Sequence, residues 1–202
     1  SSIRFEFFKI IIKQVNMKKF LVLIYIFLFG LPAFCAGRTS ATYVIDPVKN
    51  AYEHNNLGVI YTEEKCYYAA IQEFKIAISL NPKTQATSVY FNNLGKVYMT
   101  IGYPDLALDC FQNALTQYNL NFEYYKNLVD CYKKLGQISN QLQIYKTKTS
   151  PLDKVMLGLL YEQTGDIKKA IIVLDEFAMS EPNLMITPAV KDYIQTLVNK
   201  IS

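Results

Sequence analysis

The sequence has little histidine and cysteine, and this scarcity excludes several kinds of site. Of its 202 residues, one is histidine (His54) and four are cysteine. No two cysteines have the CxxC spacing of a metal or thiol–disulfide site. No serine, cysteine or acid is placed to work with His54 as a nucleophile–base set. We therefore expect no enzyme, no metal site and no cofactor, and a structural role for His54.

An excess of charge is also missing from most of the chain. The formal net charge is +4, and residues 1–35 carry all of it with five basic residues and one acid. The rest of the chain holds 16 Lys and Arg against 16 Asp and Glu. A neutral body offers no general electrostatic attraction for nucleic acid or anionic lipid. The tyrosines and phenylalanines then serve core packing better than base stacking, and we expect no nucleic-acid partner.

No hydrophobic run is long enough to predict a transmembrane helix. Residues 17–36, "MKKFLVLIYIFLFGLPAFCA", begin with Met and two lysines, and the apolar run from Phe20 to Leu31 has about 12 residues, whereas a span needs roughly 20. This is the pattern of a secretory signal peptide, with cleavage after Cys35 or Gly37. We expect export to the periplasm or the cell exterior; an uncleaved anchor that keeps the protein on the membrane is the alternative. Residues 1–16 are an upstream segment that the native protein need not contain, and 37–46 are a linker.

What the chain does contain is a repeat. "NNLGVIY" at 55–61 returns as "NNLGKVY" at 92–98, and four leucines aligned on this motif are each followed four residues later by tyrosine. Small residues recur beside and after that leucine, and a large residue follows four positions later. The leucines are Leu57, Leu94, Leu128 and Leu157; the adjacent positions are Gly58, Gly95, Val129 and Gly158; the later small positions are Ala70, Ala107, Gln141 and Ala170; the large residues are Phe74, Phe111, Tyr145 and Leu174.

This pattern resembles the tetratricopeptide repeat, in which Leu-Gly, Tyr, Ala, Phe and Pro recur over 34 residues. The resemblance covers residues 51–182 and implies an all-α fold, a right-handed superhelical solenoid of helix-turn-helix units. We expect repeats at about 51–84, 88–121, 122–150 and 151–182, and a C-terminal capping helix at 187–201, within a domain of residues 47–202. Small side chains let the two helices of a unit approach closely, and each unit buries its apolar face against the next.

Helix ends fit this organisation. Asp46-Pro47 and Ser150-Pro151 predict helix starts, and Thr187 is expected to cap the last helix. Gly102, Gly136 and Gly165 fall at the turns inside the hairpins, where a left-handed backbone is needed. The first hairpin has Lys65 there instead, so either it keeps the same backbone at a cost of about 1 kcal/mol or its turn has a different shape.

The third repeat departs most from the pattern. It is five residues short of 34, Gln141 replaces a small residue, and Lys148 stands where another small residue is expected. We therefore expect its second helix, at about 138–148, to be the least stable element.

The resemblance implies a protein-binding groove, because repeat positions 2, 5, 9 and 12 face the concave side in this family. From these positions and their neighbours we expect a partner-binding groove lined by Asn55, Val59, Asn92, Asn93, Lys96, Met99, Lys126, Asp130 and Lys133. An extended or helical peptide of a partner protein would suit such a groove. The carboxylate clamp of chaperone-binding members is not expected, because Glu123 stands where it requires a base.

The sequence thus predicts a non-catalytic protein–protein interaction scaffold of the cell envelope or secretory pathway. The alternative is a self-assembling structural component, or an assembly factor held by an uncleaved anchor. Cys110 and Cys131 lie on helices expected to adjoin, and whether they pair in an oxidising compartment stays open.

Overall fold

The computed structural model describes residues 46–201, so the predicted upstream segment, signal peptide and nearly all of the linker lie outside the described residues. The described residues 46–201 belong to one compact unit. Within 46–201 the chain forms nine helices and no strand. The helices are α3 (Pro47–Glu63), α4 (Tyr67–Leu80), α5 (Gln85–Thr100), α6 (Pro104–Gln117), α7 (Phe122–Lys134), α8 (Ile138–Lys146), α9 (Pro151–Gln163), α10 (Ile167–Ser180) and α11 (Thr187–Ile201).

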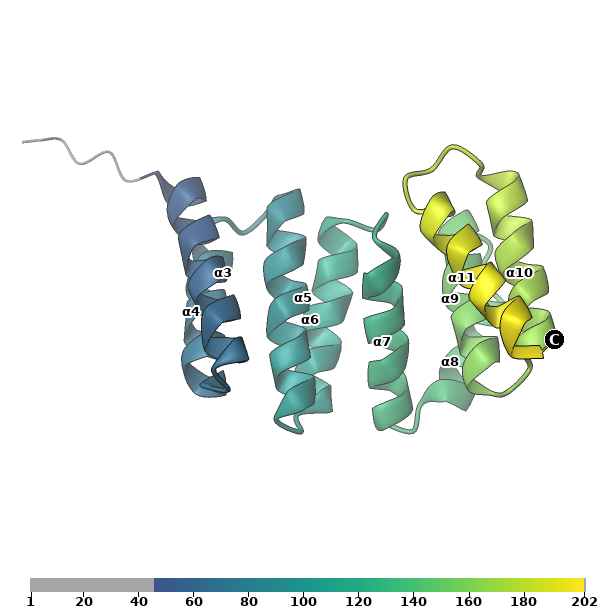
Figure 1. Ribbon diagram of the computed structural model, residues 1–202, viewed down its shortest axis with the longest axis horizontal. Helices are drawn as coiled ribbons and strands as arrows, with labels where there is room; N and C mark the ends of the chain where they lie inside the picture. Colours follow the sequence, from purple (N-terminus) through teal and green to yellow (C-terminus); the bar gives the residue numbers. More distant parts are fainter. Residues whose placement is uncertain (1–45, 202) are drawn as a thin grey trace, which may run out of the picture. The chain divides into compact units, whose positions relative to one another are not determined.

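The helices form a row of antiparallel hairpins that stack side by side (Figure 1). Helix α3 pairs closely with α4, α5 with α6, and α9 with α10. Helices α3, α5, α7 and α9 also contact one another in turn, whereas α4, α6, α8 and α10 form no comparable row. The first helices of the hairpins therefore make the inner, concave side. The all-α solenoid predicted from the sequence is confirmed.

Close approach within each hairpin depends on the small residues of the repeat. A Cβ atom built on Gly58 would lie 2.6 Å from Cε1 of Phe74, and one on Gly95 would lie 2.6 Å from Cε1 of Phe111. On Gly158 it would lie 2.5 Å from Cγ of Leu174. The alanines of the repeat, Ala70, Ala107 and Ala170, are fully buried. The large side chain of one helix thus fills the space that glycine leaves on the other.

The hairpin turns share one backbone conformation, including the turn without glycine. Gly102, Gly136 and Gly165 have φ of +85°, +67° and +83°, and Lys65 has φ of +60°. Of the two alternatives for the first turn, the structure has the one with the same backbone. The first hairpin keeps the left-handed residue and accepts its steric cost in a lysine.

The three predicted helix starts are confirmed, and so are two of the three predicted N-caps. Asp46 Oδ1 accepts from the backbone N–H groups of Val48 and Lys49 at 3.0 and 3.1 Å, and the Ser150 N–H donates to Asp153 Oδ2 at 3.2 Å. Thr187 is not a cap, because its hydroxyl donates backwards to the Glu181 carbonyl at 2.5 Å. This bond fixes the loop between α10 and α11 instead.

The third hairpin is more open than the others. Helix α8 has only nine residues, buries only Leu142, and lies more against α9 than against α7. Val129 and Gln141 stand at the two positions where the closely packed hairpins have small residues. Low stability of α8 stays a prediction.

The two ends of the solenoid differ in how well they are covered. At the C-terminal end α11 packs on α10 and buries Val190 and Leu197 completely, although Ile201 of the same predicted stripe stays exposed. At the other end Leu57 is 41% exposed, whereas the equivalent Leu94 is 4% exposed. No described element lies on that side of α3.

Candidate partner-binding groove

The predicted groove residues all lie on three successive first helices. Asn55 and Val59 are on α3; Asn92, Asn93, Lys96 and Met99 are on α5; Lys126, Asp130 and Lys133 are on α7. Val59, Lys96, Asp130 and Lys133 are exposed, while Asn93, Met99 and Lys126 are half-buried. Asn55 and Asn92 are buried. The structure thus brings these positions to one side of the row, but not all of them are open to a partner.

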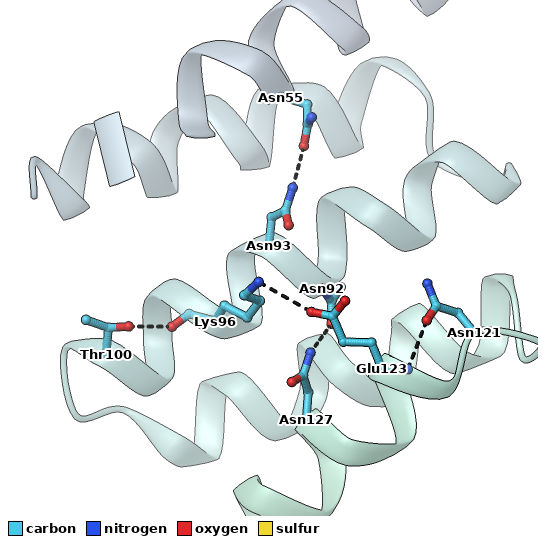
Figure 2. A network of polar contacts seen from close by, with 8 residues as sticks. All are labelled: Asn55, Asn92, Asn93, Lys96, Thr100, Asn121, Glu123 and Asn127. Atoms are coloured by element: carbon cyan, nitrogen blue, oxygen red, sulfur yellow. Dashed lines mark hydrogen bonds and ion pairs between the residues drawn. The ribbon is translucent and has the colours of Figure 1, made fainter. Parts of the chain in front are cut away.

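The asparagines bind one another across neighbouring repeats (Figure 2). Asn93 Nδ2 on α5 donates to Asn55 Oδ1 on α3 at 3.0 Å, and Asn127 Nδ2 on α7 donates to Asn92 Oδ1 on α5 at 2.7 Å. Removing one partner from a buried pair leaves an unsatisfied polar group. Asn55 and Asn92 therefore hold successive first helices in register, a role that the repeat pattern alone does not reveal.

A charged pair lies beside this network. Lys96 Nζ on α5 and Glu123 Oε1 on α7 are 3.4 Å apart, with both side chains about half exposed (Figure 2). Asn121, just before α7, accepts from the Glu123 backbone N–H at 2.9 Å and so caps that helix. Because both side chains are about half exposed, either one can leave this ion pair and bind a charged group of a ligand at little cost in free energy.

Towards the C-terminal end the inner side deepens into a cleft of about 660 Å³ between α7, α9 and α11. Its walls include Phe122, Lys126 and Asp130 of α7, Leu159 and Glu162 of α9, and Ala189 and Tyr193 of α11. The sequence predicted Lys126 and Asp130 here but missed the wall that α11 supplies. The sequence signal for this wall is Tyr193, an aromatic residue beside the apolar stripe of the predicted capping helix.

Glu162 fastens α11 to the cleft. Its Oε2 accepts from the Tyr193 hydroxyl and its Oε1 lies 2.8 Å from Lys200 Nζ, with the glutamate side chain 12% exposed. Burial raises the pKa of Tyr193, and the hydrogen bond and charge of Glu162 raise it further. Tyr193 is thus held as a neutral donor, and its ring packs edge-on against Phe122 with centroids 5.1 Å apart.

Two further charges face the cleft from α7. Lys126 Nζ lies 5.9 Å from the ring centroids of both Phe122 and Tyr193, a cation–π arrangement. Burial raises the pKa of the Asp130 carboxyl, and Lys133 and Lys126 partly offset this. Lys126 is half-buried and Asp130 is exposed, so both charges can be reached from the cleft.

The other residues singled out from the sequence have structural surroundings. His54 Nδ1 lies 2.6 Å from Glu73 Oε2 and ties α3 to α4. Cys66 is exposed, Cys110 and Cys131 are buried, and all three are free thiols. Residues 46–201 contain no cluster of three or more His, Cys, Asp or Glu side chains placed to bind a metal ion. In the same range no helix combines the length and apolar character that crossing a bilayer requires.

The family model described as "Tetratricopeptide repeat" matches residues 54–84, 89–118 and 154–183. These segments are the three closely packed hairpins α3–α4, α5–α6 and α9–α10. The chain belongs to the tetratricopeptide repeat family. The match to the family model leaves out α7 and α8, the hairpin in which both small residues of the repeat are replaced. About four tetratricopeptide repeats agree with this match and with the helix order.

Two curated proteins and one solved structure illustrate the likeness. The chain is 28% identical over 135 residues to ycf37 of Guillardia theta, covering 62% of this chain and 75% of that protein. It is 28% identical over 96 residues to Photosystem I assembly protein Ycf3 of Prochlorococcus marinus (strain MIT 9303), covering 48% of this chain and 56% of that protein. The crystal structure of MamA superposes with a TM-score of 0.46 at 17% identity, over 75% of this chain and 90% of that one.

Proposed function

We propose that this tetratricopeptide repeat protein is a non-catalytic scaffold of the cell envelope or secretory pathway that docks a segment of a partner protein along α3, α5, α7 and α9. The observation that carries the proposal is a contrast in exposure. The residues of the repeat that pack the helices together are buried, whereas Val59, Val89 and Lys96 on the inner row are exposed. The inner row ends in the cleft between α7, α9 and α11. Apolar groups flanked by polar ones are what a peptide or helix of a partner requires.

The likeness to Ycf3 supports the same class of task. That protein is named as an assembly protein of photosystem I. The chain spans about half the length of Ycf3. The likeness therefore supports a role in assembly in general and says nothing of a particular partner. The envelope or secretory location is supported by the signal-like residues 17–36.

Site-specific photocrosslinking in the cells that make the chain tests the docking surface. A photoreactive amino acid at Val59 or Val89 should crosslink one partner protein, identified by mass spectrometry. The matched control is Ile172, which is exposed on α10, outside the inner row. Equal capture of that partner from Ile172 would contradict docking on the inner row.

The self-assembly alternative is favoured by one observation, the uncovered side of α3. Leu57 and Ile60 are both exposed there, whereas the equivalent leucines of the next two repeats, Leu94 and Leu128, are buried. A photoreactive group at Ile60 that crosslinks two copies of the chain, together with sedimentation as a dimer or larger species, would support self-assembly. A monomer at tens of micromolar would exclude it as the main role.

A further inference from the structure

The charged groups of the cleft between α7, α9 and α11 fall into two classes. Glu123 is paired with Lys96, and Glu162 is bound by Tyr193 and Lys200. Lys126 has two aromatic rings as its partners, and among residues 46–201 no carboxylate lies within 4 Å of its Nζ. Asp130 likewise has no cation within ion-pair distance in that range. The cleft therefore presents one ammonium and one carboxylate without a direct ionic partner.

These two side chains are four residues apart on one face of α7, yet they do not form an ion pair. In a helix a base placed four residues before an acid is the less favourable order, because both charges then oppose the helix dipole. The aromatic rings of Phe122 and Tyr193 also hold Lys126 in place. Position and neighbours thus keep both charges available to another molecule.

The spacing of Lys126 and Asp130 along α7 indicates which kind of molecule the cleft can bind. Four helical residues rise about 6 Å along the axis, which equals the spacing of an acid and a base one turn apart on another helix. Between and beside them the cleft offers an apolar surface from Phe122, Ala189 and Met185. Met185 is 74% exposed, and a flexible thioether at the rim adapts to different side chains.

We infer that the cleft between α7, α9 and α11 binds an amphipathic helix of the partner that carries an acid and a base one turn apart, the acid against Lys126 and the base against Asp130. This inference rests on the proposed function and specifies its partner. Apolar side chains of that helix enter beside Phe122 and Met185. The raised pKa of Asp130 agrees with a partly desolvated carboxylate that a cation would stabilise.

The test uses the full chain and three fluorescein-labelled, 18-residue alanine–leucine helices that differ at two positions four residues apart. One peptide carries Glu and Lys, one carries two Glu, and one carries two Lys. In fluorescence anisotropy the Glu–Lys peptide should bind about fivefold tighter than either of the others, since two exposed ion pairs contribute about 1 kcal/mol.

Charge variants make the test specific. Asp130→Lys should shift the preference to the two-Glu peptide, and Lys126→Glu should shift it to the two-Lys peptide. Lys134→Glu changes the same charge on α7 at an exposed position outside the cleft and should leave the ranking unchanged. Circular dichroism checks that each variant is folded.

The outcomes separate this inference from the proposed function. An unchanged ranking in both cleft variants, or no binding of any peptide, overturns the helix-binding cleft. Partner capture from Val59 or Val89 would still support docking on the inner row. If neither Val59 nor Val89 captured a partner, the proposed function itself would be contradicted.

Discussion

At the scale of single residues, each repeat position has a physical task that its neighbours define. Glycine on one helix admits the ring or branched side chain of the other, alanine closes the crossing, and a left-handed residue turns the chain. Departures from these residues are therefore informative. Lys65 keeps the turn at a steric cost, while Val129 and Gln141 change the packing.

Lys65 gives the first residue-scale prediction. Because it has φ of +60°, Lys65→Gly should raise the free energy of unfolding by about 0.5–1 kcal/mol, the strain removed less the entropy that glycine adds to the unfolded chain. Urea unfolding measures the change. Lys49→Gly, at an exposed position inside α3, should instead lower stability by about 1 kcal/mol. A loss of stability in Lys65→Gly would show that the turn is not strained.

A second prediction at the scale of single residues concerns Gly95. A Cβ there would lie 2.6 Å from Cε1 of Phe111, so Gly95→Ala should cost about 1–2 kcal/mol, because overpacking exceeds the gain in helix propensity. A double-mutant cycle with Phe111→Leu tests the cause, since leucine lacks the ring atoms Cε1 and Cζ. The cost of Gly95→Ala should fall in that background. A stabilising Gly95→Ala would contradict the close approach of α5 and α6.

The thiols give the third. Burial raises the pKa of Cys110 to about 12, with the nearby Asp109 adding to it, and burial raises that of Cys131 to about 11, with Asp105 adding to it. The Cys131 thiol also donates to the Pro104 carbonyl at 3.1 Å. Iodoacetamide at pH 8 should therefore modify exposed Cys66 and spare Cys110 and Cys131, as peptide mass spectrometry can show. All three should react in denaturant. Fast modification of either buried thiol, or a Cys110–Cys131 disulfide, would contradict the structure.

At the scale of elements, the sequence predicted helix order, hairpin pairing and the weak third repeat, because the repeat spacing encodes them directly. It could not predict that α8 lies mainly against α9, since the repeat pattern marks which small residues are missing but not where the helix then packs. It also missed the role of α11 in the cleft. Tyr193 contacts Phe122, 71 residues earlier in the chain, and no local pattern encodes such a contact.

The open third hairpin predicts uneven local stability. Helix α8 buries only Leu142, so its amides should exchange with solvent at least about tenfold faster than those of α6 under native conditions. Hydrogen exchange with mass spectrometry on peptides from 138–146 and 104–117 makes the comparison. Equal protection of the two helices would mean that α8 is as firmly packed as its counterparts.

At the scale of the whole domain, one construction rule produces both the fold and the surface. Small and large residues alternate between helices to join the hairpins, and Asn55–Asn93 and Asn92–Asn127 hold the inner helices in register. That use of Asn92 changes how the groove is to be probed. Replacing Asn92 removes a buried hydrogen bond and affects stability as well as binding, whereas exposed Val59 and Val89 report on binding alone.

The inner row of first helices is proposed as the surface that receives the partner. The most direct measurement is hydrogen exchange of the chain with and without the partner identified by crosslinking. Slowed exchange should concentrate on α5, α7 and the cleft side of α9 and α11, with α4 and α6 unchanged. Protection confined to α4, α6 and α10 would place the partner on the outer side and contradict the account.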